Sequence, residues 1–282
     1  MNALEIKNLT KYLSGFTIDR LNLTLPSGCI MGLIGENGAG KTTTIKLILN
    51  ILHKDSGSIT ILGRDNGKNI HLVMEDVGVV LDETGIPDFL TAMQVGNVMQ
   101  FSFKNWDSEK YVQLLRRLSV PKNKPFQKLS RGMKMKLGIA IAMSHNAKLL
   151  ILDEATAGLD PVVRDEVVEM LMDFTREETH SVLISSHIVS DLEKLCDYIA
   201  FLHRGKLVLC EEKDRLKEEY CLLHGTAEQI NALPQDAILH KKVSPYGVEA
   251  LVLRDAVPHG MPVSPISIEE LFVFMVKGGQ VR

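Results

Sequence analysis

Eight consecutive residues constrain the fold of this chain more strongly than any other segment: Gly35-Glu36-Asn37-Gly38-Ala39-Gly40-Lys41-Thr42. They match the pattern G-x-x-x-x-G-K-[ST] at every position. The apolar run Cys29–Ile34 precedes them, and a helical pattern over about Lys41–Leu52 follows. A glycine-rich turn between a buried strand and a helix aims main-chain N–H groups and the helix N-terminus at an anion. The segment therefore predicts a phosphate-binding loop in an α/β domain.

The residue types of this loop predict a nucleoside triphosphate and Mg²⁺ as its ligands. Lys41 is a compact cation that can reach the β- and γ-phosphates, and the Thr42 hydroxyl is a hard oxygen ligand of the kind that Mg²⁺ prefers. The next residue, Thr43, belongs to the same expected nucleotide-binding set. The alternative, a glycine-rich turn that binds nothing, is disfavoured because the whole pattern and both flanking elements agree.

Two acids follow a second apolar run. Leu149–Leu152 predicts a buried strand, and Asp153 and Glu154 come directly after it. Ligands of open α/β sheets bind outside the carboxyl ends of the strands, so both acids are expected to face the nucleotide. Asp153 is the candidate Mg²⁺ ligand, through a water molecule, and Glu154 is the candidate that orients or deprotonates the attacking water. A strand end with two solvated acids is the alternative.

The remaining pattern predicts an α/β fold, a P-loop NTPase core with a mixed sheet. Period-two alternation in Leu4-Ile6-Leu9 and Leu21-Leu23-Leu25 predicts an antiparallel β subdomain. Further strands are expected at Ser58–Leu62, Val77–Leu81, Val182–Ser185 and Ile199–Leu202, and a helix after Pro161. Helical spacing over about residues 87–145 predicts a helical subdomain inserted between strands. We expect residues 1–218 to form this ATPase domain.

Residues 219–282 are expected to form a small C-terminal α+β appendix. Ala237–Leu239 and Val248–Leu253 flank a turn at Ser244–Gly247 and predict a hairpin. Ser267 and Glu270 form a capping box before a short apolar helix that stops at Gly278-Gly279. The appendix is interpreted as a regulatory or dimerisation module or as structural padding, and the pattern does not choose among them.

Composition excludes several classes of function. The 282 residues carry a net charge of −3, whereas nucleic-acid-binding domains are usually strongly basic. No apolar run approaches the roughly 20 residues of a bilayer span, the N-terminus lacks a signal peptide, and the four cysteines form no CxxC pair, which is typical of the cytosol. One basic cluster is interpreted as a solvated helical face: Lys122, Lys124, Lys128, Arg131, Lys134 and Lys136.

With these motifs in place, Leu129-Ser130-Arg131-Gly132-Met133 resembles the L-S-G-G-Q signature of ATP-binding cassette (ABC) proteins, just before the strand that carries Asp153. The resemblance covers roughly residues 1–215. Ser130 alone predicts an N-cap for a helix over Arg131–Met143, whose free N–H groups would form a second anion site. The resemblance implies that Ser130 and Gly132 bind the γ-phosphate held by the opposite subunit, in a head-to-tail dimer with two ATP molecules.

The resemblance assigns three further residues. Asp160 lies in Ala157–Asp160, which resembles the D-loop of the dimer interface, although it can equally cap the next helix. His187 resembles the switch histidine that contacts the γ-phosphate. Tyr12 stands roughly where the family has an aromatic residue that stacks on adenine, and Phe16 is its rival.

The chain departs from the family pattern at two places. Asp82 stands where the family has a glutamine that touches Mg²⁺ and the attacking water, and we expect Asp82 to keep this catalytic and metal-sensing role. Arg131 and Met133 replace a glycine and the glutamine of the signature. Arg131 is interpreted either as a fixed cation near the phosphate site or as a solvated surface residue.

The resemblance implies the ATPase subunit of an ABC transporter, which couples ATP-driven dimerisation to a separately encoded transmembrane permease, most like an exporter. The permease would dock near Asp82, between the helical subdomain and the sheet, and would hold the chain at the inner face of the membrane. The second cassette is either a copy of this chain or a different one. The alternatives are a soluble cassette ATPase that acts on ribosomes or DNA, and a P-loop kinase or regulatory NTPase. Cargo and direction are not encoded in this chain.

Overall fold

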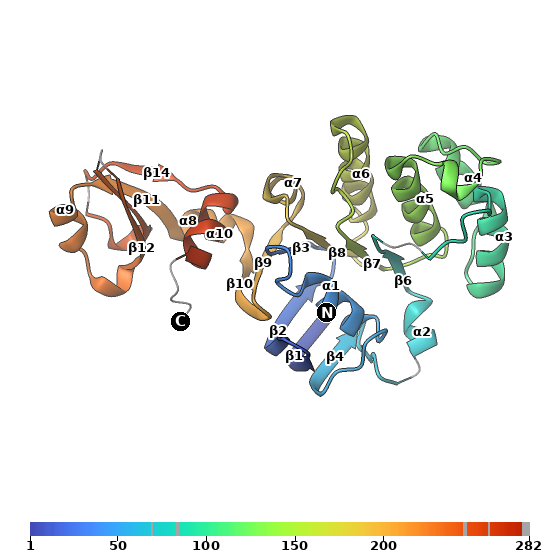
Figure 1. Ribbon diagram of the computed structural model, residues 1–282, viewed down its shortest axis with the longest axis horizontal. Helices are drawn as coiled ribbons and strands as arrows, with labels where there is room; N and C mark the ends of the chain where they lie inside the picture. The colour runs from blue at the N-terminus through green and yellow to red at the C-terminus, as the bar shows by residue number, and fades with distance from the viewer. Residues whose placement is uncertain (69, 83–84, 245–246, 259, 278–282) are drawn as a thin grey trace.

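The computed structural model describes residues 1–68, 70–82, 85–244, 247–258 and 260–277. Its central feature is a six-stranded sheet (Figure 1). In spatial order, its strands are β10 (Lys206–Glu212), β9 (Tyr198–His203), β3 (Ile30–Ile34), β8 (Ser181–Ser186), β7 (Leu149–Asp153) and β6 (Val77–Val80). Neighbouring strands are parallel except for β10, which pairs antiparallel with β9. The predicted mixed sheet is confirmed.

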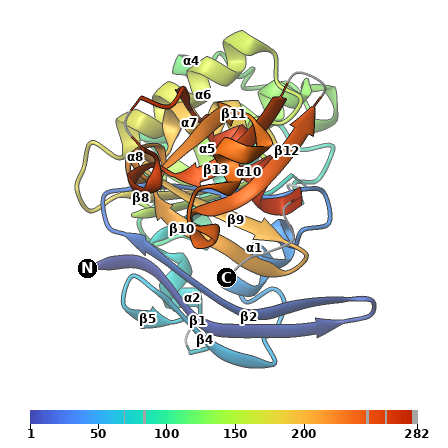
Figure 2. The same ribbon diagram turned by 90° about the vertical axis from the view of Figure 1, so that its left-hand side faces the viewer.

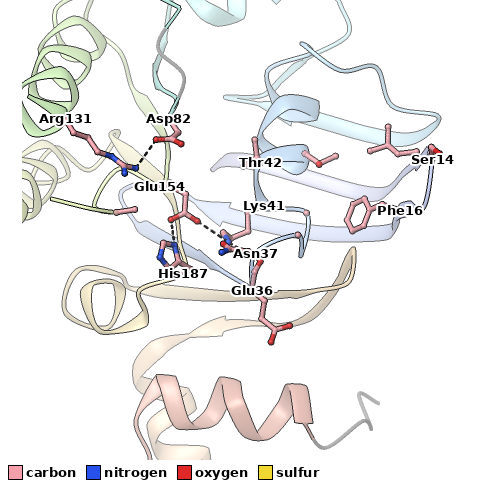
Figure 3. A pocket seen from close by; sticks show the side chains of 15 residues that line it. Ser14, Phe16, Glu36, Asn37, Lys41, Thr42, Asp82, Arg131, Glu154 and His187 are labelled. Carbon is pink, nitrogen blue, oxygen red and sulfur yellow. Dashed lines mark hydrogen bonds and ion pairs between the residues drawn. The ribbon is translucent and has the colours of Figure 1, made fainter. Parts of the chain in front are cut away.

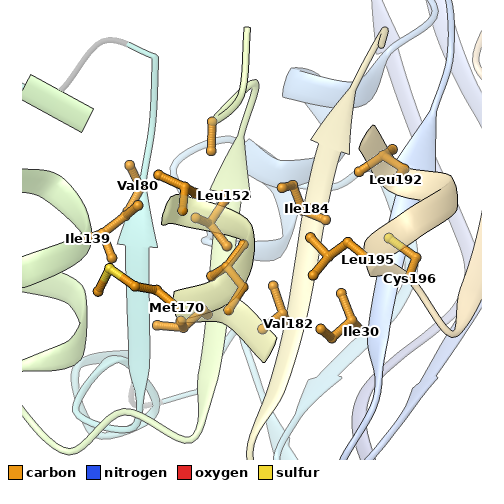
Figure 4. Packing of buried hydrophobic residues seen from close by; sticks show 14 of the residues in the cluster. Ile30, Val80, Ile139, Leu152, Met170, Val182, Ile184, Leu192, Leu195 and Cys196 are labelled. Carbon is orange, nitrogen blue, oxygen red and sulfur yellow. The ribbon is translucent and has the colours of Figure 1, made fainter. Parts of the chain in front are cut away.

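The strands of this sheet are continuous apolar runs because both faces of the sheet are covered. On β7, Leu150 and Leu152 pack into the hydrophobic cluster on one face, and Leu149 and Ile151 pack into the cluster on the other. Figure 4 shows the first face. Its cover comprises α5 (Arg131–Met143), α6 (Pro161–Phe174) and α7 (Val189–Leu195).

The opposite face is covered by α1 (Lys41–Ile48) and by an antiparallel sheet of order β2-β1-β4-β5. Its strands are β1 (Asn2–Leu13), β2 (Phe16–Pro26), β4 (Ser56–Ile61) and β5 (Arg64–Asp65). Figure 2 shows β1 and β2 as a long paired hairpin. The alternating leucines and isoleucines of both strands are buried, so the predicted antiparallel subdomain is confirmed.

The segment between β6 and β7 is helical, as its spacing predicts. It contains α3 (Ala92–Ser102), α4 (Ser108–Arg117), the 3₁₀ turn Phe126–Lys128 and α5. Tyr111 of α4 is 2% exposed and its hydroxyl donates to Ala92 O at 2.7 Å, which ties α4 to the start of α3. Burial raises the pKa of the Tyr111 phenol well above its ordinary value.

The chain after β10 forms a third sheet, of order β12-β13-β11-β14. The elements are α8 (Lys213–Glu219), β11 (Tyr220–Gly225), α9 (Ala227–Asn231), the 3₁₀ turn Gln235–Ala237, β12 (Ile238–Ser244), β13 (Gly247–Leu253), the 3₁₀ turn Arg254–Ala256, β14 (Val263–Pro265) and α10 (Ile268–Lys277). β12 and β13 confirm the predicted hairpin, although Pro245 and Tyr246 of its predicted turn lie outside the described residues. The sequence pattern does not predict β11, because a short apolar run does not distinguish a strand from a helix, and it does not predict α9, whose five residues are too few to show a helical period.

The capping box of α10 is confirmed. Ser267 N donates to Glu270 Oε2 at 3.0 Å, and Glu270 N donates to Ser267 Oγ at 3.2 Å. The predicted stop at Gly278-Gly279 lies outside the described residues. The ring of Phe272 on α10 packs against Phe201 of β9, with centroids 5.2 Å apart. The third sheet therefore shares buried surface with the central one, and a division into domains at residue 218 stays a prediction.

Two further points concern the chain as a whole. Among the described residues, no helix is both long enough and apolar enough to cross a bilayer. The four cysteines are free. Burial raises the pKa of the Cys210 thiol to about 11 and that of the Cys196 thiol still further, so both behave as apolar side chains of the interior.

Helix α1 is shorter than its pattern predicts, since it ends at Ile48 rather than Leu52. Asn50 adopts a left-handed backbone, with φ +55°, which stops the helix. Asn66 is 1% exposed, and its amide donates to Leu47 O at 2.9 Å and to Ile48 O at 3.0 Å. A side chain 18 residues further along the chain than Ile48 thus satisfies the last carbonyls of α1, which no local pattern reveals.

Replacing Asn66 by alanine is expected to destabilise the protein by about 1–3 kcal/mol, since the Ile48 carbonyl loses this donor and the Leu47 carbonyl keeps only the backbone N–H of Asn50. Asn66→Asp is expected to destabilise it more, because a carboxylate would face both carbonyl oxygens. Urea unfolding followed by circular dichroism measures both. Wild-type stability in Asn66→Ala would show that these hydrogen bonds do not hold the helix end.

Candidate functional site

A cavity of about 610 Å³ opens at the carboxyl ends of the central strands (Figure 3). The loop between β3 and α1, the end of β7, the residue after β8 and the first residue of α5 meet around it. Its lining comprises Leu13, Ser14, Phe16, Glu36, Asn37, Gly38, Gly40, Lys41, Thr42, Thr43, Asp82, Arg131, Glu154, Ala157 and His187. The structure therefore brings together most of the residues that the sequence marks as candidates.

The glycine-rich loop turns directly into α1. Gly40 is the N-cap of α1 and has a φ of +109°, which L-residues rarely adopt. A Cβ atom there would lie 2.7 Å from Cζ of Phe16, so no side chain fits. The N–H groups of the first turn of α1 have no acceptor within the helix and carry its partial positive charge. The loop therefore has the geometry of an anion-binding turn. Gly35 and Ala39 are buried beneath it.

Lys41 is 5% exposed, and its ammonium group has three oxygen partners. Nζ donates to Gly35 O at 2.7 Å and Glu36 O at 3.3 Å, and it lies 3.1 Å from Glu154 Oε1. A buried ammonium without partners costs several kcal/mol, so these contacts hold the cation at the loop. An anionic ligand that binds Lys41 would therefore compete with the Glu154 carboxylate for the ammonium group.

Glu154 lies between two basic groups. Its Oε2 accepts from His187 Nδ1 at 2.7 Å, while its Oε1 faces Lys41 (Figure 3). Glu154 also has a left-handed backbone, with φ +52°, which is uncommon for a residue with a side chain. This turn at the end of β7 is what brings the carboxylate into the cavity. The arrangement can hold a water molecule or a proton at the Glu154 carboxylate and can bind anions at Lys41 and His187.

Asp153 is 3% exposed and lies behind the cavity lining. Its Oδ1 accepts from Ser185 Oγ at 2.6 Å. Where phosphate oxygens supply most ligands, Mg²⁺ takes only one or two protein oxygens and several water molecules. The Thr42 hydroxyl and the Asp153 carboxylate are oxygen donors of this kind, one in the cavity and one at its edge. These residues fit the ion.

The two departures from the family pattern contact each other. Arg131 Nη2 lies 3.1 Å from Asp82 Oδ1, and both side chains line the cavity. Gly158, with φ +68°, provides the space, because a Cβ there would lie 2.8 Å from Arg131 Nη1. The sequence marks Asp82 and Arg131 separately, and only the fold shows that they form an ion pair. In this structure Asp82 faces a cation.

Ser130, Gly132 and Asp160, three further candidates from the signature and the D-loop, lie outside the cavity lining. Ser130 caps α5, since its hydroxyl accepts from Met133 N at 3.3 Å, as predicted. Gly132 faces Val163 of α6. Asp160 caps α6 by accepting from Val163 N at 3.0 Å, which is the simpler of its two predicted roles. The chain does not bring these residues to its own P-loop.

One sequence interpretation stays a prediction and another changes. Tyr12 is 68% exposed and lines a hollow beside the cavity together with Phe16 and Gly38, whereas Phe16 also lines the cavity itself, so both stay candidates for the contact with adenine. The basic cluster is not a uniform solvated face: Lys136 is 7% exposed and pairs with Glu166, and Lys134 lies 4.6 Å from the centre of the Phe126 ring. The interpretation is wrong for Lys136, whose side chain α6 covers.

Comparisons with known proteins agree with this geometry. The ABC transporter family model matches residues 18–157. The bacitracin transport ATP-binding protein BcrA of Bacillus licheniformis is 32% identical over 304 residues, which span 99% of this chain and 98% of BcrA.

Two solved structures share the fold. The ATP-binding subunit of an ABC transporter superposes with a TM-score of 0.69 and 26% identity, covering 76% of this chain and 92% of that one. A dimeric ATP-binding cassette in a post-hydrolysis state with ADP and Pi has a TM-score of 0.67 and 20% identity, covering 74% and 98%.

The Asp82–Arg131 pair predicts coupled effects on nucleotide affinity. Arg131→Gln should weaken binding of a fluorescent ATP analogue, and Asp82→Asn should strengthen it, each by about two- to fivefold, as expected for an exposed pair worth 0.5–1 kcal/mol. The change in binding free energy in the double variant should differ from the sum of the changes in the two single variants. Raising the salt concentration should shrink both effects. Strict additivity at low salt would contradict the pairing.

Proposed function

This chain belongs to the ABC transporter family and hydrolyses ATP, and we propose that it drives a membrane permease that is a separate polypeptide. The observation that carries the proposal is the convergence of Lys41, Glu154 and His187 in one cavity beside an anion-binding turn. The match to BcrA, which is named for bacitracin transport and aligns over almost all of this chain, supports the transport role.

ATP is proposed to bind by exchange of ionic partners. In the free chain, the Lys41 ammonium group pairs with the Glu154 carboxylate and donates hydrogen bonds to loop carbonyls. A triphosphate carries more negative charge than one carboxylate, so its oxygens replace Glu154 at Lys41, while the amides at the start of α1 hold the same phosphates. Tyr12 and Phe16 both line a hollow beside Gly38 of the loop, and one of these two aromatic residues is proposed to contact the base. The exchange releases the Glu154 carboxylate.

Glu154 and His187 are proposed to carry out the hydrolytic step. Once released from Lys41, the Glu154 carboxylate orients the attacking water and accepts its proton, and His187, which faces it at 2.7 Å, contacts the terminal phosphate. When bound, Mg²⁺ neutralises charge on the phosphates, and Thr42 and Asp153 are proposed to hold it. Asp82 is proposed to sense the ion, and its pairing with Arg131 keeps its charge balanced until nucleotide enters.

The second half of the site is proposed to come from another cassette. Ser130 and Gly132 lie at the free N-terminus of α5 but not in this chain's own cavity, and Asp160 is also outside it. This placement suits residues that serve a nucleotide held by a partner cassette. A solved cassette with this fold is a dimer. The partner is either a second copy of this chain or a different cassette.

The permease is proposed to dock on the helical subdomain. Phe89, close after Asp82 in the chain, is 72% exposed, and Val98 and Phe101 on one face of α3 are 50% and 91% exposed. Large apolar side chains at such exposure mark a surface that another molecule covers. The permease would hold this chain at the inner face of the membrane. Export is the proposed direction, on the resemblance to exporters with separately encoded cassettes. The comparisons do not support the ribosome-acting alternative.

Variants at Lys41 and Glu154 separate nucleotide binding from hydrolysis. Lys41→Ala should abolish hydrolysis and weaken ATP binding, because the phosphates lose their buried cation. Glu154→Gln should keep ATP binding but lower the hydrolysis rate by at least about 100-fold, since the amide accepts no proton. Phosphate release and a fluorescent ATP analogue report the two steps, and light scattering reports ATP-dependent dimers. Normal hydrolysis in Lys41→Ala would overturn the assignment of this site.

Permease coupling is tested by identifying the genes that neighbour this chain's gene and co-expressing the chain with any product that has several membrane spans. Detergent-solubilised membranes should retain the wild type, and Phe101→Ser should lose retention without a change in basal hydrolysis. Val243→Ser is the matched control, because Val243 is 79% exposed on β12 of the C-terminal sheet. Pelleting with ribosomes in place of membranes would favour the alternative function.

A further inference from the structure

Ser185 of β8 connects the two acids at the end of β7. It is fully buried, and its hydroxyl donates to Asp153 Oδ1 at 2.6 Å. Ser185 Oγ also accepts a hydrogen bond from the backbone N–H of Glu154 at 3.0 Å. The parallel register places Asp153 directly beside Ser185, so one hydroxyl reaches both residues.

The contact with Glu154 supports an unfavourable backbone. A left-handed conformation costs a residue with a side chain about 1–2 kcal/mol, and Glu154 adopts it with φ +52°. Its N–H also donates to Ser185 O, but at 3.2 Å. Without the hydroxyl, this longer contact alone would restrain the turn that aims the Glu154 carboxylate at Lys41 and His187.

The contact with Asp153 fixes the orientation of a buried carboxylate. Because the Ser185 hydroxyl donates its hydrogen bond to Oδ1, that oxygen is held in place and the carboxylate group cannot rotate freely. A short hydrogen bond to a buried anion is strong, so this orientation is maintained in the free chain.

We propose that Ser185 is a positioning residue for ATP hydrolysis, which sets the orientation of Asp153 and the backbone of Glu154 at once. The inference rests on the proposed roles of these two acids. Ser185 touches neither nucleotide nor water in this assignment, and it acts through its neighbours. The rate of hydrolysis falls steeply when a catalytic carboxylate is displaced, since a misplacement of about 1 Å can lower the rate about 100-fold.

A buried serine can also be merely structural, and the same strand provides the comparison. Ser181, at the other end of β8, is fully buried, accepts from Gly28 N at 3.0 Å and donates to Pro26 O at 3.4 Å. Ser181→Ala and Ser185→Ala thus remove the same chemical group, with two partners each, from one strand. Only the second lies beside the acids.

Ser185→Ala is expected to lower kcat by about 10- to 100-fold with KM for ATP changed less than about twofold, because binding depends on Lys41 and the loop. Binding of a fluorescent ATP analogue without Mg²⁺ should be unchanged, while the Mg²⁺ concentration needed for half-maximal enhancement of binding should rise. Ser181→Ala should leave all three quantities unchanged. Ser185→Thr, which keeps the hydroxyl, should restore most of kcat.

Equal kcat values for Ser185→Ala and Ser181→Ala would overturn the inference, and so would a loss in Ser185→Ala that tracks only its thermal stability. If the extra methyl group of Ser185→Thr prevents folding, the comparison of the two alanine variants still tests the inference. Adding Ser185→Ala to Glu154→Gln should lower kcat by a smaller factor than it does in the wild type, because only the effect through Asp153 then remains. Normal hydrolysis in Glu154→Gln would instead refute the proposed role of Glu154, a result distinct from failure at Ser185.

Discussion

The parallel register of β3, β8 and β7 is the constraint on which the whole site depends. Backbone pairing sets Ile34 beside Ser186 and Asp153 beside Ser185, so three strands end at one level. The loops that follow them carry Lys41, His187 and Glu154, residues more than 30 positions apart that meet within hydrogen-bond distance. The apolar burial of both sheet faces holds this register, because a slip of one residue would turn the buried side chains of each strand to the wrong face.

Charge balance explains how such a site exists without its ligand. Lys41 and Arg131 both line the cavity, and each has an acid as partner: Lys41 has Glu154, and Arg131 has Asp82. The first pair is buried and the second is more than half exposed, so they differ in strength. In the proposed mechanism, an incoming triphosphate replaces Glu154 at Lys41, and the released carboxylate then faces the attacking water. Nucleotide binding and activation of the base would then follow from the same exchange.

Sequence reasoning succeeds where the physical cause is local. The glycine-rich loop, the strand ends and the caps at Ser130 and Ser267 depend on neighbours within a few residues. It fails where the cause lies elsewhere in the chain. The last carbonyl of α1 is satisfied by Asn66, and the contact of Phe16 with the loop depends on how the β1–β2 hairpin crosses Gly40. β11 is six residues long and apolar, and only its partners β13 and β14 distinguish it from a helix end. Ser185 carries no motif, so its contacts emerge only from the register.

The departures at Asp82 and Arg131 also take a different meaning in the fold. Taken separately, an acid near the γ-phosphate is repulsive, and an arginine in a glycine position of the signature is bulky. Together they form one neutral contact between the segment after β6 and the start of α5, and Gly158 leaves the space for it. Since β6 belongs to the sheet and α5 to the helical subdomain, this contact links the two parts that face the nucleotide. A change at either residue therefore leaves the charge of the other without its partner in this contact. The pair is for this reason one departure from the family pattern rather than two.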